Sequence, residues 1–198
     1  MAAKLLYFLI NKPYGVLSQF TGEDGHPGLG SIFDLPKDVY PVGRLDRDSE
    51  GLLILTNDRR LNKTLLDPAN RHERTYWVEV EGIPTATELR QLEKGVKISA
   101  KGKKHNTAPA EASLLSGVNL EERDPPVNRL KHKVTSWVEV VLTEGKNRQV
   151  RKMTAAVNHP TLRLIRVGIE QVQLGQMQSG EITQISEKVL KKKLSIPF

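Results

Sequence analysis

The alternation of apolar and polar positions predicts a chain rich in strands, with a few short helices between them. In the segment 74–80, Tyr76 and Val78 share one face of a strand while Trp77 lies on the other. Further strands are predicted at 5–11, 52–55, 137–142, 161–167 and 170–174, with a looser alternation at 108–115. Because helices interrupt these strands at irregular intervals, the pattern indicates an α+β fold rather than a doubly wound sheet.

Three helices are indicated by capping residues and by a spacing of 3.6 residues. Polar residues at 56–58 offer an N-cap for a helix at 59–66, whose apolar stripe is Leu61, Leu65 and Leu66. Thr85 and Glu88 have the spacing of a capping box, and Gly95 ends the helix that follows. A third helix is predicted at 147–157, with an apolar side and a basic side, and a basic short helix or tail at 188–193.

The segments between these elements read as loops. Residues 19–30 contain four glycines and a proline, and Ile32, Phe33 and Leu35 are expected to dock the next segment on the core. Residues 100–106 are predicted to be a basic connector. Residues 117–134 have no strand or helix period and are predicted to be a mobile insertion that closes on RNA; a solvated disordered loop fits the composition equally well.

Composition narrows the class of partner. A chain of 198 residues can bury one substantial core, folded as two lobes, and the net charge of +7 favours a polyanionic partner. Nine of the positive charges but only two of the negative ones lie between residues 127 and 166. The absence of cysteine excludes disulfides and thiolate chemistry and fits a cytoplasmic protein, and no apolar run approaches the roughly 18 residues of a membrane span.

The strongest chemical signal is the stretch 41–58, where a polar turn precedes the buried strand at 52–55. Asp46 stands between Arg44 and Arg47, which favour its ionised form. A carboxylate on such a rigid support suits catalysis. From these residues alone, a turn aspartate that binds its own backbone is the more common interpretation of Asp46, and a solvated charged turn is a second alternative for Asp46 and the neighbouring acids.

This stretch resembles the catalytic motif of the RsuA/RluB/E/F branch of pseudouridine synthases, most of all the E subgroup of large-subunit ribosomal RNA enzymes. The matching motif is Gly-Arg-Leu-Asp at 43–46 followed by Ser-Glu-Gly-Leu-Leu-Ile-Leu-Thr-Asn-Asp at 49–58. The resemblance continues at 11–15, 76–82, 144–153 and 161–166. It implies a mainly antiparallel mixed β-sheet with flanking helices and a central cleft.

The resemblance implies three catalytic residues. Asp46 is the essential carboxylate, and Tyr76 stacks on the uracil and can relay a proton; without the motif, Tyr76 reads as a core tyrosine. Arg151 corresponds to an arginine that orients the aspartate, although a phosphate clamp is the alternative. RNA contacts are predicted for six basic residues: Lys12, Arg44, Arg47, Lys146, Arg148 and Lys152.

The expected activity is isomerisation of a specific uridine in large-subunit (23S) ribosomal RNA to pseudouridine. The reaction involves no redox change, so no cofactor and no metal is expected. We expect one catalytic domain over 1–198, without a separate N-terminal S4-like RNA-binding domain, acting as a monomer on free ribosomal RNA or an assembly intermediate. Two alternatives stay open: a metal-dependent nuclease that uses Asp46, Asp48 and Glu50, and a non-catalytic RNA-binding module.

Overall fold

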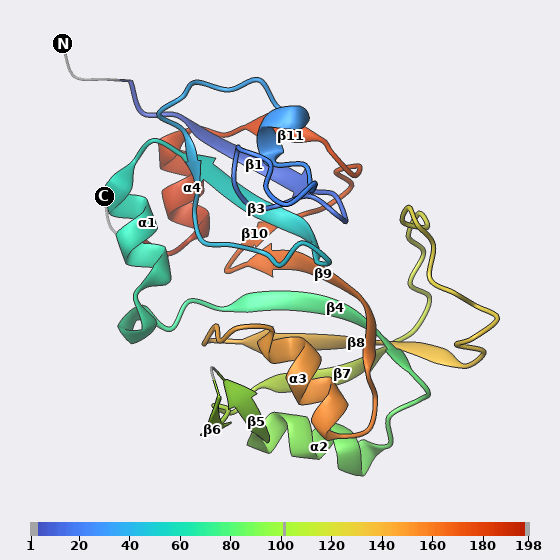
Figure 1. The fold of residues 1–198 in the computed structure, drawn as a ribbon. Coiled ribbons are helices and arrows are strands. Elements are labelled where there is room, and N and C mark those ends of the chain that lie inside the picture. Colours follow the sequence, from blue (N-terminus) through green and yellow to red (C-terminus); the bar gives the residue numbers. More distant parts are fainter. Residues whose placement is uncertain (1–3, 101, 197–198) are drawn as a thin grey trace. The chain divides into compact units, whose positions relative to one another are not determined.

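A computed structural model describes residues 4–100 and 102–196 of the chain (Figure 1). Strands, helices and two 3₁₀ helices (η) follow one another in the order β1 (Tyr7–Lys12), η1 (Leu29–Ser31), β2 (Tyr40–Pro41), β3 (Glu50–Thr56), α1 (Arg59–Leu66), η2 (Pro68–Asn70), β4 (Arg74–Glu81), α2 (Ala86–Lys94), β5 (Lys97–Ala100), β6 (Lys103–Asn106), β7 (Glu111–Leu115), β8 (Thr135–Leu142), α3 (Gln149–Ala156), β9 (Thr161–Ile169), β10 (Val172–Gln173), β11 (Ile182–Gln184) and α4 (Glu187–Lys193). The predicted α+β class is confirmed.

The chain divides into two compact units. The first comprises the described residues up to His72 together with those from Arg166 onward, and the second runs from Glu73 to Ile165. In the first unit β1 lies between β11 and β3 and pairs with both in antiparallel fashion. β2 adds to β3, and β10 pairs with β9, again antiparallel.

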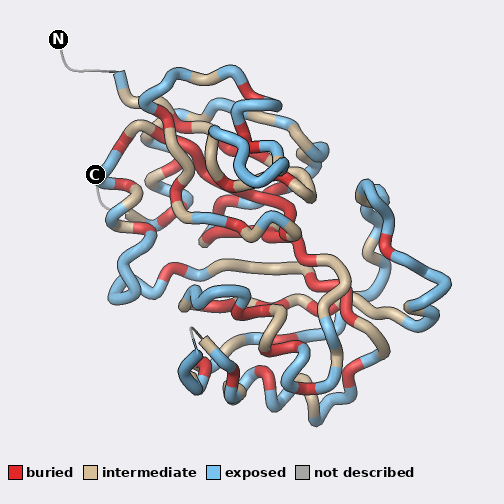
Figure 2. Tube along the Cα trace, in the orientation of Figure 1, coloured by how far each residue is buried: buried red, intermediate tan, exposed pale blue. Residues whose placement is uncertain are grey.

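Strand β3 is the centre of the first unit. All seven of its residues are buried, which Figure 2 shows as a continuous red stretch. A strand that is covered on both faces favours apolar side chains on both, which explains why residues 52–55 form an uninterrupted apolar run, although the buried ends of the strand include Glu50 and Thr56. Leu53 and Leu55 contribute to a core cluster with Ile10 of β1 and with Leu29 and Phe33 from the loop segment that precedes β2.

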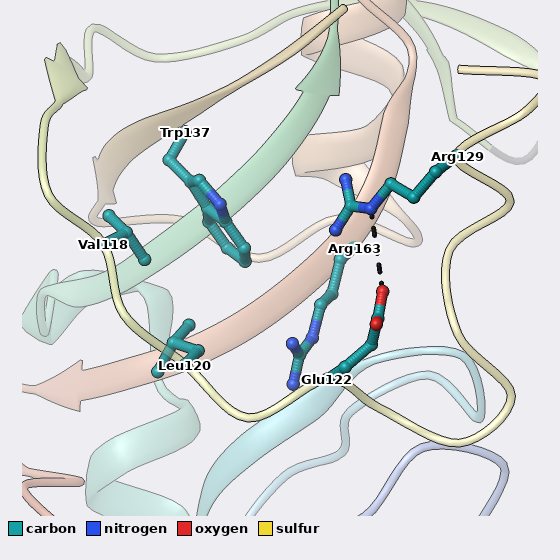
Figure 3. Close-up of a pocket in the computed structure, with 6 residues that line it drawn as sticks. All are labelled: Val118, Leu120, Glu122, Arg129, Trp137 and Arg163. Carbon is teal, nitrogen blue, oxygen red and sulfur yellow. Dashed lines mark ion pairs between the residues drawn. The ribbon is translucent and has the colours of Figure 1, made fainter. Parts of the chain in front are cut away.

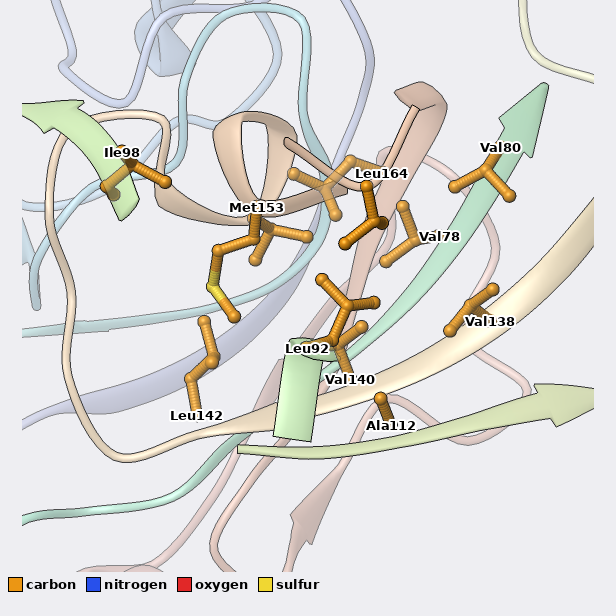
Figure 4. Packing of buried hydrophobic residues seen from close by; sticks show 12 residues of the cluster. Val78, Val80, Leu92, Ile98, Ala112, Val138, Val140, Leu142, Met153 and Leu164 are labelled. Atoms are coloured by element: carbon orange, nitrogen blue, oxygen red, sulfur yellow. The ribbon is translucent and has the colours of Figure 1, made fainter. Parts of the chain in front are cut away.

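The second unit is an antiparallel sheet in the order β4–β8–β7, with α2 and α3 on one face. Val78 of β4 lies opposite Val138 of β8, and both belong to the core cluster of Figure 4. Leu92 of α2 and Met153 of α3 belong to the same cluster. Since side chains alternate along a strand, the residues next to these valines point to the other face, away from the helices.

The predicted helix signals are confirmed at two helices. The Asp58 carboxylate accepts a hydrogen bond from the Arg60 amide at the start of α1 (3.0 Å). Thr85 and Glu88 form the reciprocal capping box of α2. Gly95 follows that helix with a φ of +92°, and a Cβ there would lie 2.4 Å from the Thr107 carbonyl oxygen, so the position requires glycine.

Some local predictions are wrong. The segment 100–106 is not only a connector, because Lys103–Asn106 is a strand (β6) paired with Lys97–Ala100 (β5). Leu66 and Ile32 are 45% and 41% exposed, so neither belongs to the core. Within the described part of the chain, no helix has the length and apolar character to span a membrane.

Candidate active site

The turn that carries Asp46 is held by its backbone in the first unit. The Ser18 hydroxyl donates to the Leu45 carbonyl oxygen (2.8 Å) and accepts from the Leu45 amide (3.0 Å). On the other side, the Ser49 amide donates to the Asp46 carbonyl oxygen (3.0 Å), closing a tight turn. Leu45 is buried and Asp46 half-buried, so the loop fixes the carboxylate at the edge of the core.

Lys12 supports this turn from beneath, which corrects its predicted role as an RNA contact. Its side chain is fully buried, and its Nζ lies 2.8 Å from the carbonyl oxygens of Pro13 and Val16 and 3.4 Å from that of Arg47. An ammonium group has three N–H donors, so these three acceptors occupy all of them. Burial lowers the pKa of Lys12 to about 8, although Glu50, Asp48 and Asp46 oppose the effect.

The two arginines beside Asp46 are both exposed, as contact with RNA would require. The Arg47 guanidinium lies 2.8 Å from Nδ1 of His26, which belongs to the loop before η1. The Gly15 amide donates to the Arg47 carbonyl oxygen (2.9 Å), so the backbone of Arg47 is fixed while its side chain reaches the surface.

The nuclease alternative required three carboxylates on one strand face. Only Glu50 lies in β3, whereas Asp46 and Asp48 belong to the preceding turn. Glu50 is buried and the other two are half-buried. Within the described ranges, no group of three or more histidine, aspartate or glutamate side chains is arranged to hold a metal ion.

Tyr76 lies in β4 of the second unit. It is half-buried and packs against the core cluster that contains Val150 and Met153 of α3. The pairing of β4 with β8, in which Tyr76 lies opposite Val140, fixes the direction of the Tyr76 side chain. The ring therefore has one part in the core and another part exposed, as a stacking tyrosine needs.

Arg151 lies in the first turn of α3, next to a loop that is held by Glu144. This carboxylate accepts hydrogen bonds from the Ala108 amide (2.8 Å) and from Nε2 of the buried Gln149 (2.7 Å). Burial by itself raises the pKa of Glu144, but these bonds and one from His105 outweigh it, and the pKa is lowered. The Lys146 amide donates to Oε1 of Gln149 (2.8 Å), which fixes the start of the helix.

The basic residues around α3 differ in exposure. Lys146 and Arg148 are exposed, whereas Arg151 and Lys152 are half-buried. Lys152 Nζ donates to the Asn147 carbonyl oxygen (2.7 Å), so its ammonium is held over the loop at the start of the helix. The apolar side predicted for this helix is confirmed, because Val150 and Met153 are buried.

Comparison with known proteins assigns the family. A sequence profile described as RNA pseudouridylate synthase matches residues 6–156, which include the Asp46 turn, β4 and α3. The chain belongs to this family. The resemblance identified from the sequence motifs is therefore confirmed.

Relatives of this pseudouridine synthase cover most of its length. Ribosomal large subunit pseudouridine synthase E of Xanthomonas axonopodis pv. citri is 50% identical over 163 residues, which cover 81% of this chain and 84% of the relative. The protein of the same description from Vibrio parahaemolyticus is 44% identical over 89% of this chain and 72% of its own length. A crystal structure of a pseudouridylate synthase has a TM-score of 0.78 at 26% identity and covers 96% of this chain and 74% of that one.

Two buried polar residues of this pseudouridine synthase were not identified from its sequence. Ser18 clamps Leu45, and Arg166 donates from Nε to the Leu52 carbonyl oxygen of β3 (2.8 Å) with only 4% of its surface exposed. Arg166 ends one of the matching motifs, and an arginine flanked by Ile165 and Val167 within a strand was the available signal. Ser18 lies in a loop without any period, so no signal marked it.

Proposed function

We propose that this protein isomerises a specific uridine of large-subunit (23S) ribosomal RNA to pseudouridine, with Asp46 as its essential carboxylate. The observation that carries the proposal is the position of Asp46, on a turn clamped by Ser18 and entering the fully buried β3. The substrate class is supported by relatives at 44–50% identity described as ribosomal large subunit pseudouridine synthase E.

The reaction exchanges one glycosidic bond for another. The bond between uracil N1 and ribose C1′ breaks, a bond between uracil C5 and C1′ forms, and C5 loses a proton while N1 gains one. Substrate and product have the same atoms and the same oxidation level, so the net reaction requires neither an oxidant nor a reductant. A carboxylate can serve by adding to the sugar, by adding to the base, or by taking a proton from ribose C2′.

Tyr76 and Arg151 are proposed to assist the carboxylate. The ring of Tyr76, fixed by the strand pairing of β4, stacks on the uracil after the base has left the RNA stack, and its hydroxyl relays the proton lost from C5. Arg151 orients Asp46 through paired hydrogen bonds, for which the planar guanidinium is suited.

The proposed RNA path uses the basic residues that remain after the correction of Lys12. Arg44, Arg47, Lys146 and Arg148 are exposed, and Lys152 is half-buried at the start of α3. Phosphate contacts from these side chains position the RNA without reading its sequence. We further propose that the protein acts in the cytoplasm as a monomer, on free ribosomal RNA or an assembly intermediate.

The test is the variant Asp46→Asn, which preserves side-chain volume and removes the charge. Purified wild type and variant are incubated with 23S rRNA transcribed in vitro, and pseudouridine is detected by mass spectrometry after cyanoethylation. We expect the variant to bind RNA as wild type does and to form no pseudouridine. Asp34→Asn, at an exposed loop aspartate, is the matched control and should remain active.

Two results would contradict the proposal. Turnover by Asp46→Asn would remove Asp46 from the mechanism. Binding by wild type that leaves every uridine unchanged would favour a non-catalytic RNA-binding module. Chelation with EDTA adds a third comparison, because loss of RNA cleavage on chelation is the behaviour of a metal-dependent nuclease.

A further inference from the structure

A pocket of about 280 Å³ lies within the second unit, beside the loop 117–134. Its lining combines one aromatic ring, two guanidinium groups, two aliphatic side chains and one carboxylate: Trp137, Arg129, Arg163, Val118, Leu120 and Glu122. In Figure 3 the ring of Trp137 lies between the aliphatic side chains on one side and the two arginines on the other. None of these residues takes part in the proposed chemistry.

Trp137 lies on the face of the sheet opposite to α2 and α3. Its neighbour Val138 belongs to the core under α2 and α3, so Trp137 points to the opposite face. Trp77 of β4 lies on that same face, where its Nε1 donates to Oε2 of Glu139 (2.9 Å). The loop 117–134 supplies four of the residues that line the pocket, and Trp137 of β8 and Arg163 of β9 supply the sheet side, so the pocket lies between loop and sheet.

The loop is anchored around this pocket. Arg129 forms an ion pair with Glu79, a carboxylate that is only 1% exposed, and Thr135 donates to the same oxygen (2.9 Å). Arg163 donates to the Glu121 carbonyl oxygen (2.7 Å), and Val127 is buried. The pocket walls are thus positioned by contacts that exist without a ligand, which reduces the entropy lost on binding.

We propose that this pocket binds one unpaired nucleobase of the RNA substrate, outside the catalytic site. The inference rests on the proposed function for the identity of the ligand. Stacking of a base on an aromatic ring or on the plane of an arginine is a common mode of recognising unstacked RNA bases. Pockets for drug-sized ligands measure roughly 300–1,000 Å³, so a pocket of about 280 Å³, just below this range, suits a single base.

Charge also favours RNA over an apolar partner. The loop carries exposed Lys131 and Lys133 as well as the exposed carboxylates Glu121, Glu122 and Asp124, while Arg129 is paired with Glu79 and Arg163 lines the pocket. Phosphates on either side of the bound base would meet these cations. Binding at this point would give the enzyme a second contact with its RNA and contribute to the choice of uridine.

The two tryptophans of the chain allow a direct test. Trp77→Phe leaves Trp137 as the single tryptophan, and Trp137→Phe leaves Trp77 on the same sheet face as the matched control. Fluorescence is recorded while 23S rRNA transcribed in vitro is added to saturation, with binding confirmed by filter retention. We expect Trp137 emission to be quenched, as base stacking on an indole causes, and Trp77 emission to change little.

A binding measurement complements the fluorescence. Trp137→Leu should weaken affinity for the transcript roughly 5- to 150-fold, as loss of a stacking ring does, while the single-turnover rate at saturating RNA stays near that of wild type. The fluorescence test keeps Trp137 in place, so it does not depend on the folding of that variant. Unchanged Trp137 emission at saturation, equal quenching of both tryptophans, or wild-type affinity of a folded Trp137→Leu would overturn the proposal.

These results separate the pocket from the catalytic assignment. Formation of pseudouridine by wild type tests the proposed function and does not involve Trp137. If Trp137 is quenched by RNA but no pseudouridine forms, the pocket stands and the proposed function fails. If pseudouridine forms and Trp137 does not respond, the proposed function stands and the pocket is not a base-binding site.

Discussion

Replacing the buried Lys12 by methionine should alter the pH dependence of stability. The substitution keeps an unbranched side chain of similar length and removes the ammonium group that lies 2.8 Å from the carbonyl oxygens of Pro13 and Val16. Two hydrogen bonds from a charged donor contribute roughly 3–6 kcal/mol in total. Removing the buried charge stabilises the folded variant by about 3 kcal/mol, which is the free energy that corresponds to the fall of the Lys12 pKa from 10.5 to about 8. At pH 7 the variant should therefore be less stable by only about 0–3 kcal/mol.

The dependence on pH is the sharper observable. Below pH 8 both the folded and the unfolded wild type carry the proton on Lys12, so its titration contributes no slope. Between pH 8 and 10.5 the unfolded chain retains a proton that the folded chain has lost, and the free energy of unfolding rises with pH. Between pH 7 and 9.5 the wild type should gain about 2 kcal/mol relative to Lys12→Met.

The assay is urea unfolding followed by circular dichroism at intervals between pH 7 and 9.5. Lys63→Met, at an exposed lysine of α1, controls for the loss of one positive charge and should run parallel to wild type. Other groups that titrate in this range are present in all three proteins and cancel in the differences. Parallel curves for wild type and Lys12→Met would refute the reasoning, since they would mean that folding does not lower the pKa of Lys12.

Three further predictions concern the catalytic motif and α3. Arg151→Lys keeps the charge and loses the planar fork, so the saturated single-turnover rate should fall steeply with little change in RNA affinity; a rate equal to wild type would assign Arg151 to phosphate binding. Arg148→Ala and Lys152→Ala should each reduce the magnitude of the negative slope of log affinity against log salt by about 0.7–0.9, and an unchanged slope in both would place the RNA path elsewhere. Asp58→Ala removes the α1 cap and leaves the buried Tyr7 hydroxyl without its acceptor, so urea unfolding should show a loss of about 2–4 kcal/mol; a loss below 0.5 kcal/mol would contradict this account.

The elements that could be predicted from the sequence are those whose signals are local. The capping box of α2 lies within four residues, and the alternation that identifies β4 lies within eight. The buried run at 52–55 in β3 was evident because four consecutive apolar residues are typical of a strand covered on both faces. Such patterns depend on neighbours in the sequence, so no knowledge of the fold is needed to read them.

The features that could not be predicted depend on contacts between distant segments or lack a pattern. Lys12 is buried because carbonyl oxygens from residues 13, 16 and 47 converge on it, and its own neighbours do not reveal this. The β5–β6 hairpin has Ile98 as its one buried strand residue, and its second strand is polar throughout, so it offered no apolar alternation. The two strands of this hairpin are held together by backbone hydrogen bonds, and the pattern of side chains along the sequence does not reveal such bonds.

The two ends of the motif that identified the family have different roles. At the end of β3, the Thr56 hydroxyl donates to the Leu6 carbonyl oxygen (2.6 Å), and Oδ1 of Asn57 accepts from the Leu6 amide (2.8 Å). These contacts join the end of β3 to the start of β1, and Asp58 caps the helix that follows. At the beginning of β3, the turn presents Asp46. Since both ends of one buried strand are fixed, a shift in register along β3 would disturb the anchor and the Asp46 carboxylate together, which explains why the motif extends well beyond Asp46.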